Sequence, residues 1–146
     1  MRRSPTGSSV CAVVAERSLI GASSAGETFE VAQDVAIKLA QAIGDPHPDY
    51  EAGLAVPPTF PTTFWSRLSI PALDEIDPAR FLHGEQEYVY ERPIRPGERL
   101  SCAARVVEVT EKETRLGRVT FLVVETEGRD EAGARVFTGR STLILR

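Results

Sequence analysis

The sequence has little of what metal or thiol chemistry requires. Its 146 residues include two cysteines and two histidines, with no CxxC pair and no metal-type Cys/His spacing. Cys11 and Cys102 lie far apart, and histidine partners for a catalytic thiol are scarce. We therefore expect two free thiols, with Cys102 as a small strand residue, and no metal site.

Long apolar runs and an excess of positive charge are also missing. No run approaches the roughly 20 apolar residues that span a bilayer. The early run Val10–Ala15 is shorter than the apolar core of a signal peptide, which is about 7–15 residues. The net charge of −4 argues against nonspecific nucleic-acid binding, which needs a basic surface. We expect a cytoplasmic protein with no membrane insertion and no nucleic-acid partner.

What is present is typical of one globular domain. Hydrophobic content of 42% and charged content of 26% are ordinary values, and 146 residues can bury a real core. Residues 1–18 are expected to form a partly disordered N-terminal extension, because its first residues are rich in Arg, Ser, Pro and Gly. Residues 19–146 are expected to form the single domain.

Two helices are predicted in the first half of the chain. Apolar residues recur at helical spacing over residues 33–43, and Gly44 provides a C-terminal stop. A second, buried helix is predicted from about Thr59 to Ile70 on the spacing of its aromatic residues, with Pro61 in the first turn. The proline-rich segment between the two helices is expected to be a loop, because proline cannot sit inside a helix.

The second half of the sequence predicts strands. Aromatic and polar residues alternate over residues 86–92, and three longer β-rich runs follow at residues 100–109, 118–127 and 135–145. Short polar links separate these runs, which favours an antiparallel meander of three or four strands. Helices followed by an antiparallel sheet indicate an α+β fold.

Three motifs in a fixed order carry a family resemblance. They are AIGDPHPDY at residues 42–50, GLAVPPTFP at residues 53–61 and FLHGEQEYVYERPIRPGERL at residues 81–100. Together they resemble the MaoC-like family of (R)-specific enoyl hydratases and 3-hydroxyacyl dehydratases. The similarity is to its non-classical branch, which includes the N-terminal halves of two-domain dehydratases and the accessory subunits of mycobacterial (3R)-hydroxyacyl-ACP dehydratases. The resemblance implies a single hot-dog domain, in which a curved antiparallel sheet wraps around a central helix.

The first motif departs from the family at one catalytic position. In the family, an Asp and a His five residues apart activate water for addition to a trans-2-enoyl thioester, or for the reverse dehydration. Asp45 stands at the family's Asp position, but Tyr50 replaces its His, and His47 stands where the family has Asn. Histidine is a good general base near neutral pH and tyrosine is a poor one. The candidate catalytic residues are Asp45, His47 and Tyr50.

Structural roles compete with functional ones at these positions. Asp45 can bond neighbouring loop N–H groups as Asx turns do, His47 can be an exposed loop residue, and Tyr50 can pack at a subunit interface. Arg92 and Arg95 can meet a carrier phosphate or lie in a solvated turn. His83 can bond the loop before its strand, and the aromatic candidates can belong to the core. The substrate-binding residues implied by the resemblance are Pro58, Thr59, Phe60, Phe64, Trp65, His83 and Gly84.

The resemblance implies hydration and dehydration of (R)-3-hydroxyacyl and trans-2-enoyl thioesters, with acyl-CoA or acyl-ACP as substrate and no cofactor. Because Tyr50 replaces the family's His, we expect a substrate-binding subunit whose partner carries the Asp/His pair. A homodimer, or a heterodimer with a second MaoC-like chain, is expected because a lone sheet leaves an edge exposed. Catalysis by His47 alone, a hot-dog thioesterase and a non-catalytic acyl-thioester binding protein are the alternatives.

Overall fold

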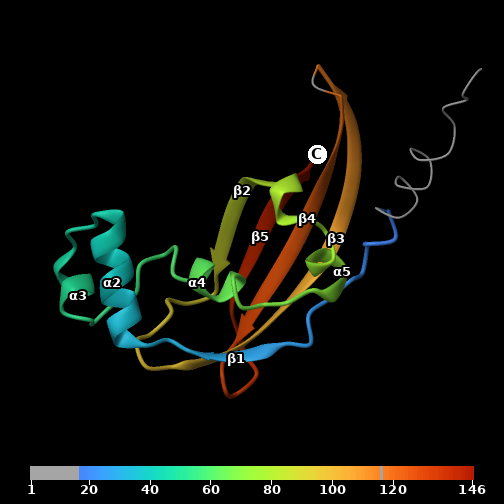
Figure 1. Cartoon of the computed structure of the whole chain (residues 1–146). Coiled ribbons are helices and arrows are strands. Elements are labelled where there is room, and N and C mark those ends of the chain that lie inside the picture. Colours follow the sequence, from blue (N-terminus) through green and yellow to red (C-terminus); the bar gives the residue numbers. More distant parts are fainter. Residues whose placement is uncertain (1–16, 116) are drawn as a thin grey trace, which may run out of the picture.

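Five strands form one antiparallel sheet in the computed structural model, which describes residues 17–115 and 117–146. The strands are β1 Glu27–Glu30, β2 Phe81–Tyr90, β3 Arg99–Thr114, β4 Gly117–Arg129 and β5 Arg135–Leu145. Their order is β1-β3-β4-β5-β2, so β1 and β2 form opposite edges (Figure 1). The predicted α+β class and the antiparallel meander are confirmed. Cys11 and nearly all of the predicted extension lie outside the described residues.

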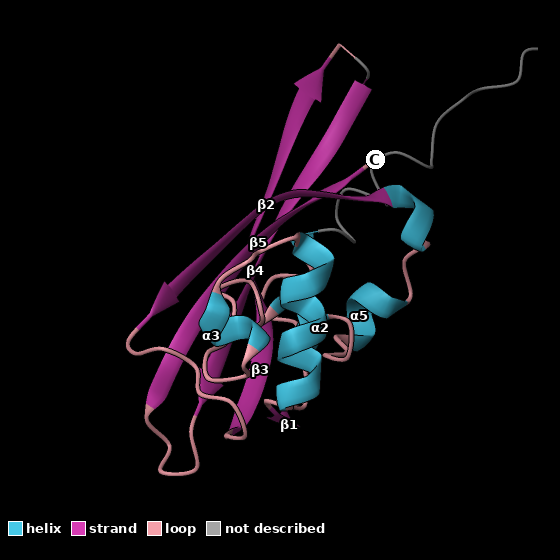
Figure 2. Ribbon diagram, turned by 90° about the vertical axis from the view of Figure 1, so that its left-hand side faces the viewer, coloured by secondary structure: helices cyan, strands magenta, loops and turns pink. Residues whose placement is uncertain are grey.

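Alternation along the strands decides which face of the sheet is buried. In β3, Leu100, Cys102, Ala104 and Val106 are buried, while the residues between them are exposed. Buried residues of β4 and β5 join the same hydrophobic core. We call the face that carries these side chains the inner face. Figure 2 shows the helical segments on one side of the sheet, and most of their buried residues belong to this core.

Helix α2, Gln33–Ile43, confirms the first predicted helix. It ends because Gly44 adopts a left-handed conformation with φ of 70°, and the N–H of Gly44 donates to the carbonyl oxygen of Gln41 at 3.2 Å. Ala36 and Ala40 are its buried residues. The stop at Gly44 places the next residue, Asp45, at the start of the loop that carries the first motif.

The second predicted helix, over residues 59–70, is wrong in length. Only α4, Thr62–Trp65, is helical there, and the separate helix α5, Pro71–Asp74, follows. The hydroxyls of Thr62 and Thr63 donate to backbone carbonyl oxygens three residues earlier, at 2.6 and 2.8 Å. Such local bonds compete with continuation of a helix. Short turns, rather than one long helix, therefore cover the inner face.

Two more short helices complete the described chain. Helix α3, Pro48–Glu51, lies inside the segment predicted as loop, and its first residue is a proline, which suits a helix start. The 3-10 helix η1, Pro78–Arg80, leads directly into β2.

Strands β2, β3 and β4 are longer than predicted. β2 starts at Phe81 rather than at residue 86, so His83 lies inside the strand and not in a loop before it. A shift in pairing between His83 and Glu85 puts an irregularity at Gly84. β3 and β4 also run past the end of β5, and their hairpin projects beyond the sheet (Figure 1).

Candidate active site

The carboxylate of Asp45 is bonded to its own loop. Its Oδ1 accepts a hydrogen bond from the backbone N–H of His47 at 3.1 Å. This geometry is that of an Asx turn, the structural alternative expected for Asp45. The bond braces the turn between α2 and α3, and the carboxylate is not part of the pocket described below.

His47 caps the start of α3. Its Nδ1 accepts a hydrogen bond from the backbone N–H of Asp49 at 3.3 Å, which satisfies a donor that the helix itself leaves free. The imidazole is about half exposed, and its ring centre lies 4.9 Å from that of Tyr50. The ring therefore supports the loop and does not line the pocket beside it.

A pocket of about 470 Å³ lies between the loop that follows α3 and the end of β2. Tyr50 contributes from α3, Pro57 and Pro58 from the loop, and Tyr90 from the last position of β2. The Tyr90 hydroxyl donates a hydrogen bond to the carbonyl oxygen of Pro58, which ties the loop to the strand. We call this hollow the Tyr50 pocket. Its volume lies within the roughly 300–1,000 Å³ typical of ligand sites.

The tyrosines of β2 keep their protons at neutral pH. Burial raises the pKa of Tyr88 to about 12. The pKa of Tyr90 is raised further, first by burial and then by the neighbouring Tyr88. Tyr90 therefore acts on the wall of the Tyr50 pocket as a neutral hydrogen-bonding group and not as a base. Glu91, also on this wall, has its Oε1 3.5 Å from Nη2 of Arg135.

Arg92 borders the Tyr50 pocket, but its guanidinium is paired with two carboxylates. Its Nη2 lies 2.8 Å from Oε2 of Glu98 and 3.2 Å from Oδ2 of Asp130. The bond to Glu98, and then that to Asp130, raise the pKa of Arg92, and the Arg92 bond lowers the pKa of Asp130. Arg92 is therefore neither an unpaired cation available to a carrier phosphate nor a solvated turn residue. Arg92 instead ties the segment after β2 to the turn before β5.

Most of the remaining candidates lie elsewhere. Phe60 and Phe64 are buried in the core, with ring centres 5.4 Å apart, as their structural alternative predicts. His83 lies in β2, with Nε2 3.3 Å from Oε1 of Gln86. Of the predicted site residues, the structure brings Tyr50 and Pro58 together at one pocket. Tyr90 was not among the predicted site residues, although the alternation of residues in YVYERP places it on the same face of the strand as Tyr88.

Among residues 17–115 and 117–146, no group of three or more His, Cys, Asp or Glu side chains is placed to hold a metal ion. Over the same ranges, no helix is both long enough and apolar enough to cross a membrane.

Known proteins resemble this chain in sequence. The family described as FAS1-like, dehydratase domain region, matches residues 18–139. A UPF0336 protein of Saccharopolyspora erythraea is 36% identical over 132 residues, which cover 81% of this chain and 82% of the relative. A UPF0336 protein of Clavibacter michiganensis is 32% identical over 136 residues, with 84% and 89% covered.

Solved structures share the fold. A chain of the C-terminally truncated HadBC (3R-hydroxyacyl-ACP dehydratase) complex from Mycobacterium tuberculosis gives a TM-score of 0.73 at 20% identity, over 86% of this chain and 96% of that chain. A chain of the ChsH1-ChsH2 complex from the same organism gives 0.69 at 19% identity, over 95% and 92%. These likenesses establish the hot-dog fold, and the family match covers most of the sequence. This chain belongs to the FAS1-like dehydratase domain family.

Proposed function

We propose that this chain is the substrate-binding subunit of an enzyme that hydrates trans-2-enoyl thioesters and dehydrates (R)-3-hydroxyacyl thioesters. Its substrate is an acyl-CoA or acyl-ACP, and its partner is a second MaoC-like chain that carries the Asp/His pair. Membership in a dehydratase domain family supports the reaction class. The two solved neighbours described above are named as complexes, which supports a partner chain.

One observation supports substrate binding by this chain and catalysis by a partner: among the described residues that line the Tyr50 pocket, none is a histidine. A general base must lie within hydrogen-bond reach of the proton that it takes. Asp45 and His47 instead bond backbone N–H groups of their own loop. Glu91 is the carboxylate on the described wall, and Arg135 neighbours it at 3.5 Å. We therefore assign the catalytic base to the partner chain.

This chain would supply the wall that holds the thioester. Pro57, Pro58 and Ile94 offer an apolar surface to the acyl group, and Tyr50 and Tyr90 line the same pocket. The proton of the Tyr90 hydroxyl is already donated to the Pro58 carbonyl oxygen, so the Tyr50 hydroxyl is the tyrosine donor that would bond the thioester carbonyl. In the described part of the chain, β2 pairs with β5 alone, so its outer edge is free to pair with another chain.

The test is an assay of the full chain with crotonyl-CoA, followed by the loss of enoyl absorbance. The chain is assayed alone and mixed with a MaoC-like chain of the same genome that has an Asp and a His five residues apart. We expect no turnover from the chain alone and turnover from the mixture. Tyr50→Ala should raise the KM of the mixture by about tenfold, or about 1.4 kcal/mol. Phe121→Ala, on the face of β4 opposite the inner face, is the matched control.

Other outcomes identify the other functions. Robust turnover by the chain alone that His47→Ala abolishes contradicts the proposal. Release of free thiol without loss of the enoyl group identifies a thioesterase. Binding of crotonyl-CoA without turnover, alone and in the mixture, identifies a non-catalytic acyl-thioester binding protein.

A further inference from the structure

Three hollows follow β2 along the inner face of the sheet. The Tyr50 pocket reaches Tyr90 at the end of the strand. A small cavity of about 10 Å³ lies at Tyr88 and Gln86. A cleft of about 350 Å³ lies at Phe81, where the strand begins. At about 3.3 Å per strand residue, Tyr90 and Phe81 are roughly 30 Å apart. The hollows therefore form one line along a single strand.

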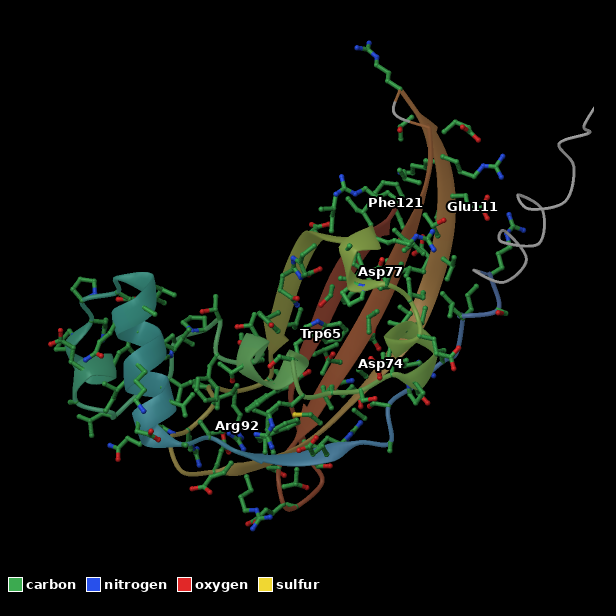
Figure 3. The ribbon with its side chains drawn as sticks, in the orientation of Figure 1. Trp65, Asp74, Asp77, Arg92, Glu111 and Phe121 are labelled. Atoms are coloured by element: carbon green, nitrogen blue, oxygen red, sulfur yellow. The ribbon has the colours of Figure 1, made fainter. Side chains whose placement is uncertain are left out.

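The segment from Pro58 to Trp65 covers this line of hollows, and its residues follow the same order as the hollows. Pro58 borders the Tyr50 pocket, Pro61 borders the small cavity, and Trp65 borders both the small cavity and the cleft. Trp65 is the last residue of α4, and the residue before it, Phe64, is buried in the core. Figure 3 shows Trp65 over the middle of the sheet. The indole is thus the partition between the small cavity and the cleft.

The small cavity is closed by packed groups that need no ligand. The Tyr88 ring lies so close to Gly139 that a Cβ added there would be 2.9 Å from Cε1 of the ring. Ser141 Oγ donates to Oε1 of Gln86 at 2.6 Å, and Gln86 Nε2 donates to the Arg140 carbonyl oxygen at 3.2 Å. A volume of about 10 Å³ holds at most one water molecule. An acyl chain that extends from the Tyr50 pocket would therefore end here.

The cleft beyond Trp65 is lined mainly by apolar residues and has no part in the proposed reaction. Leu68, Leu73 and Leu143 line it, and each is at most 9% exposed. The carboxylate on its wall, Asp74, accepts a hydrogen bond from the hydroxyl of Ser69. Walls of this kind suit a hydrocarbon chain, because each buried methylene contributes about fourfold in affinity.

We infer that Trp65 sets the length of the acyl chain that this protein accepts. The acyl chain lies in the Tyr50 pocket and ends at the small cavity, whose walls include Tyr88 and Trp65, so the cleft stays unused. Because Trp65 lines both the small cavity and the cleft, shortening its side chain enlarges the cavity, joins it to the cleft and lets a longer chain through. Trp65 acts by excluding methylene groups and takes no part in the reaction. The inference rests on the proposed acyl-thioester site.

The first test uses Trp65 as its own reporter, because it is the single tryptophan of the chain. The full chain is titrated with CoA and with butyryl-, octanoyl- and dodecanoyl-CoA that carry bromine on the terminal carbon. Bromine quenches indole emission at close range. From Tyr90 to Gln86 is roughly 13 Å along β2, so quenching should be absent with CoA and weak with the butyryl chain. It should be strong with the octanoyl chain.

The second test compares variants by calorimetric titration with unbrominated octanoyl- and dodecanoyl-CoA. Wild-type affinity should rise by less than about twofold between the two chains, because the partition blocks the extra methylenes. In Trp65→Ala and Trp65→Leu the rise should be about tenfold or more. Adding Leu143→Phe to either variant narrows the cleft and should remove the gain. Phe121→Ala, an aromatic truncation on the opposite face of the sheet, should match the wild type.

The outcomes separate this inference from the proposed function. If butyryl- and octanoyl-CoA bind but both Trp65 variants keep the wild-type chain-length profile, Trp65 is not the partition and the inference fails. Equal quenching by the butyryl and octanoyl probes also overturns it. If none of the acyl-CoAs binds, alone or with the catalytic partner chain, the acyl-thioester function fails and the inference fails with it.

Discussion

Nη2 of Arg92 lies 3.2 Å from Oδ2 of Asp130, a residue 38 positions away in the sequence. Glu98 holds the same guanidinium at 2.8 Å. Because Arg92 also borders the Tyr50 pocket, the wall of that pocket is held in place by the turn between β4 and β5. The first prediction follows from this connection.

Asp130→Asn should destabilise the fold above pH 5 and make little difference near pH 2. The bond to Arg92 lowers the pKa of Asp130 below its unfolded value, which is about 3.9. A lowered folded pKa gives stability that is present above the unfolded value and is lost as pH falls through the folded one. Urea unfolding of both proteins at pH 7, 5 and 2 measures the difference. A gap that persists unchanged at pH 2 contradicts the assignment.

Tyr90→Phe should lower the free energy of unfolding by about 1 kcal/mol, because the Pro58 carbonyl oxygen loses its donor while the ring still packs. Tyr88→Phe is the matched control, since no hydrogen bond of the Tyr88 hydroxyl links it to another described residue. Urea unfolding at pH 7 compares the two variants. Equal losses for both would show that the hydroxyl of Tyr90 does not brace the pocket wall.

Gly128→Ala should destabilise the protein by about 3 kcal/mol or more, because the core cannot accept the added methyl group. A Cβ at Gly128 would lie 2.1 Å from Cε1 of Phe137, whose side chain is fully buried and cannot move aside. Gly139→Ala meets the ring of the half-buried Tyr88 at 2.9 Å and should cost less. Thermal unfolding ranks the two variants, and the reverse order would contradict the packing argument.

Cys102 should resist thiol reagents until the protein unfolds. The residue is fully buried, and burial raises the pKa of its thiol to about 12, so almost no thiolate forms at pH 8. In a Cys11→Ser background, labelling with Ellman's reagent at pH 8 should follow the rate of unfolding and become fast in urea. Prompt labelling of the native variant would show that β3 opens locally.

Several features could be predicted because their signals are local. The ends of α2 follow from apolar spacing and from Gly44, and β5 was predicted at both ends from the composition of residues 135–145. The length predicted for the helix from Thr59 was wrong, and the reason is also local. Threonine hydroxyls bond backward to the backbone in that segment, and aromatic spacing alone does not show this competition.

Part of the candidate site is visible in the sequence. The first motif contains Tyr50, which lines the Tyr50 pocket, and its role in binding stays a prediction. The motif did not show that Asp45 and His47 bond to their own loop, because Asx turns and helix caps depend on the backbone path. Nor did it show that Arg92 is paired with Asp130, which needs two distant turns to meet.

The sequence by itself determined the α+β class, the boundaries of α2 and the departure at Tyr50, since each depends on residues close together in the chain. Only the tertiary structure decided that β2 pairs with β5 instead of its neighbour in sequence, β3. That pairing sets the line of hollows from Tyr90 to Phe81 and brings Trp65 across it. The pairing of distant strands follows from how the whole core packs, and no local pattern encodes it.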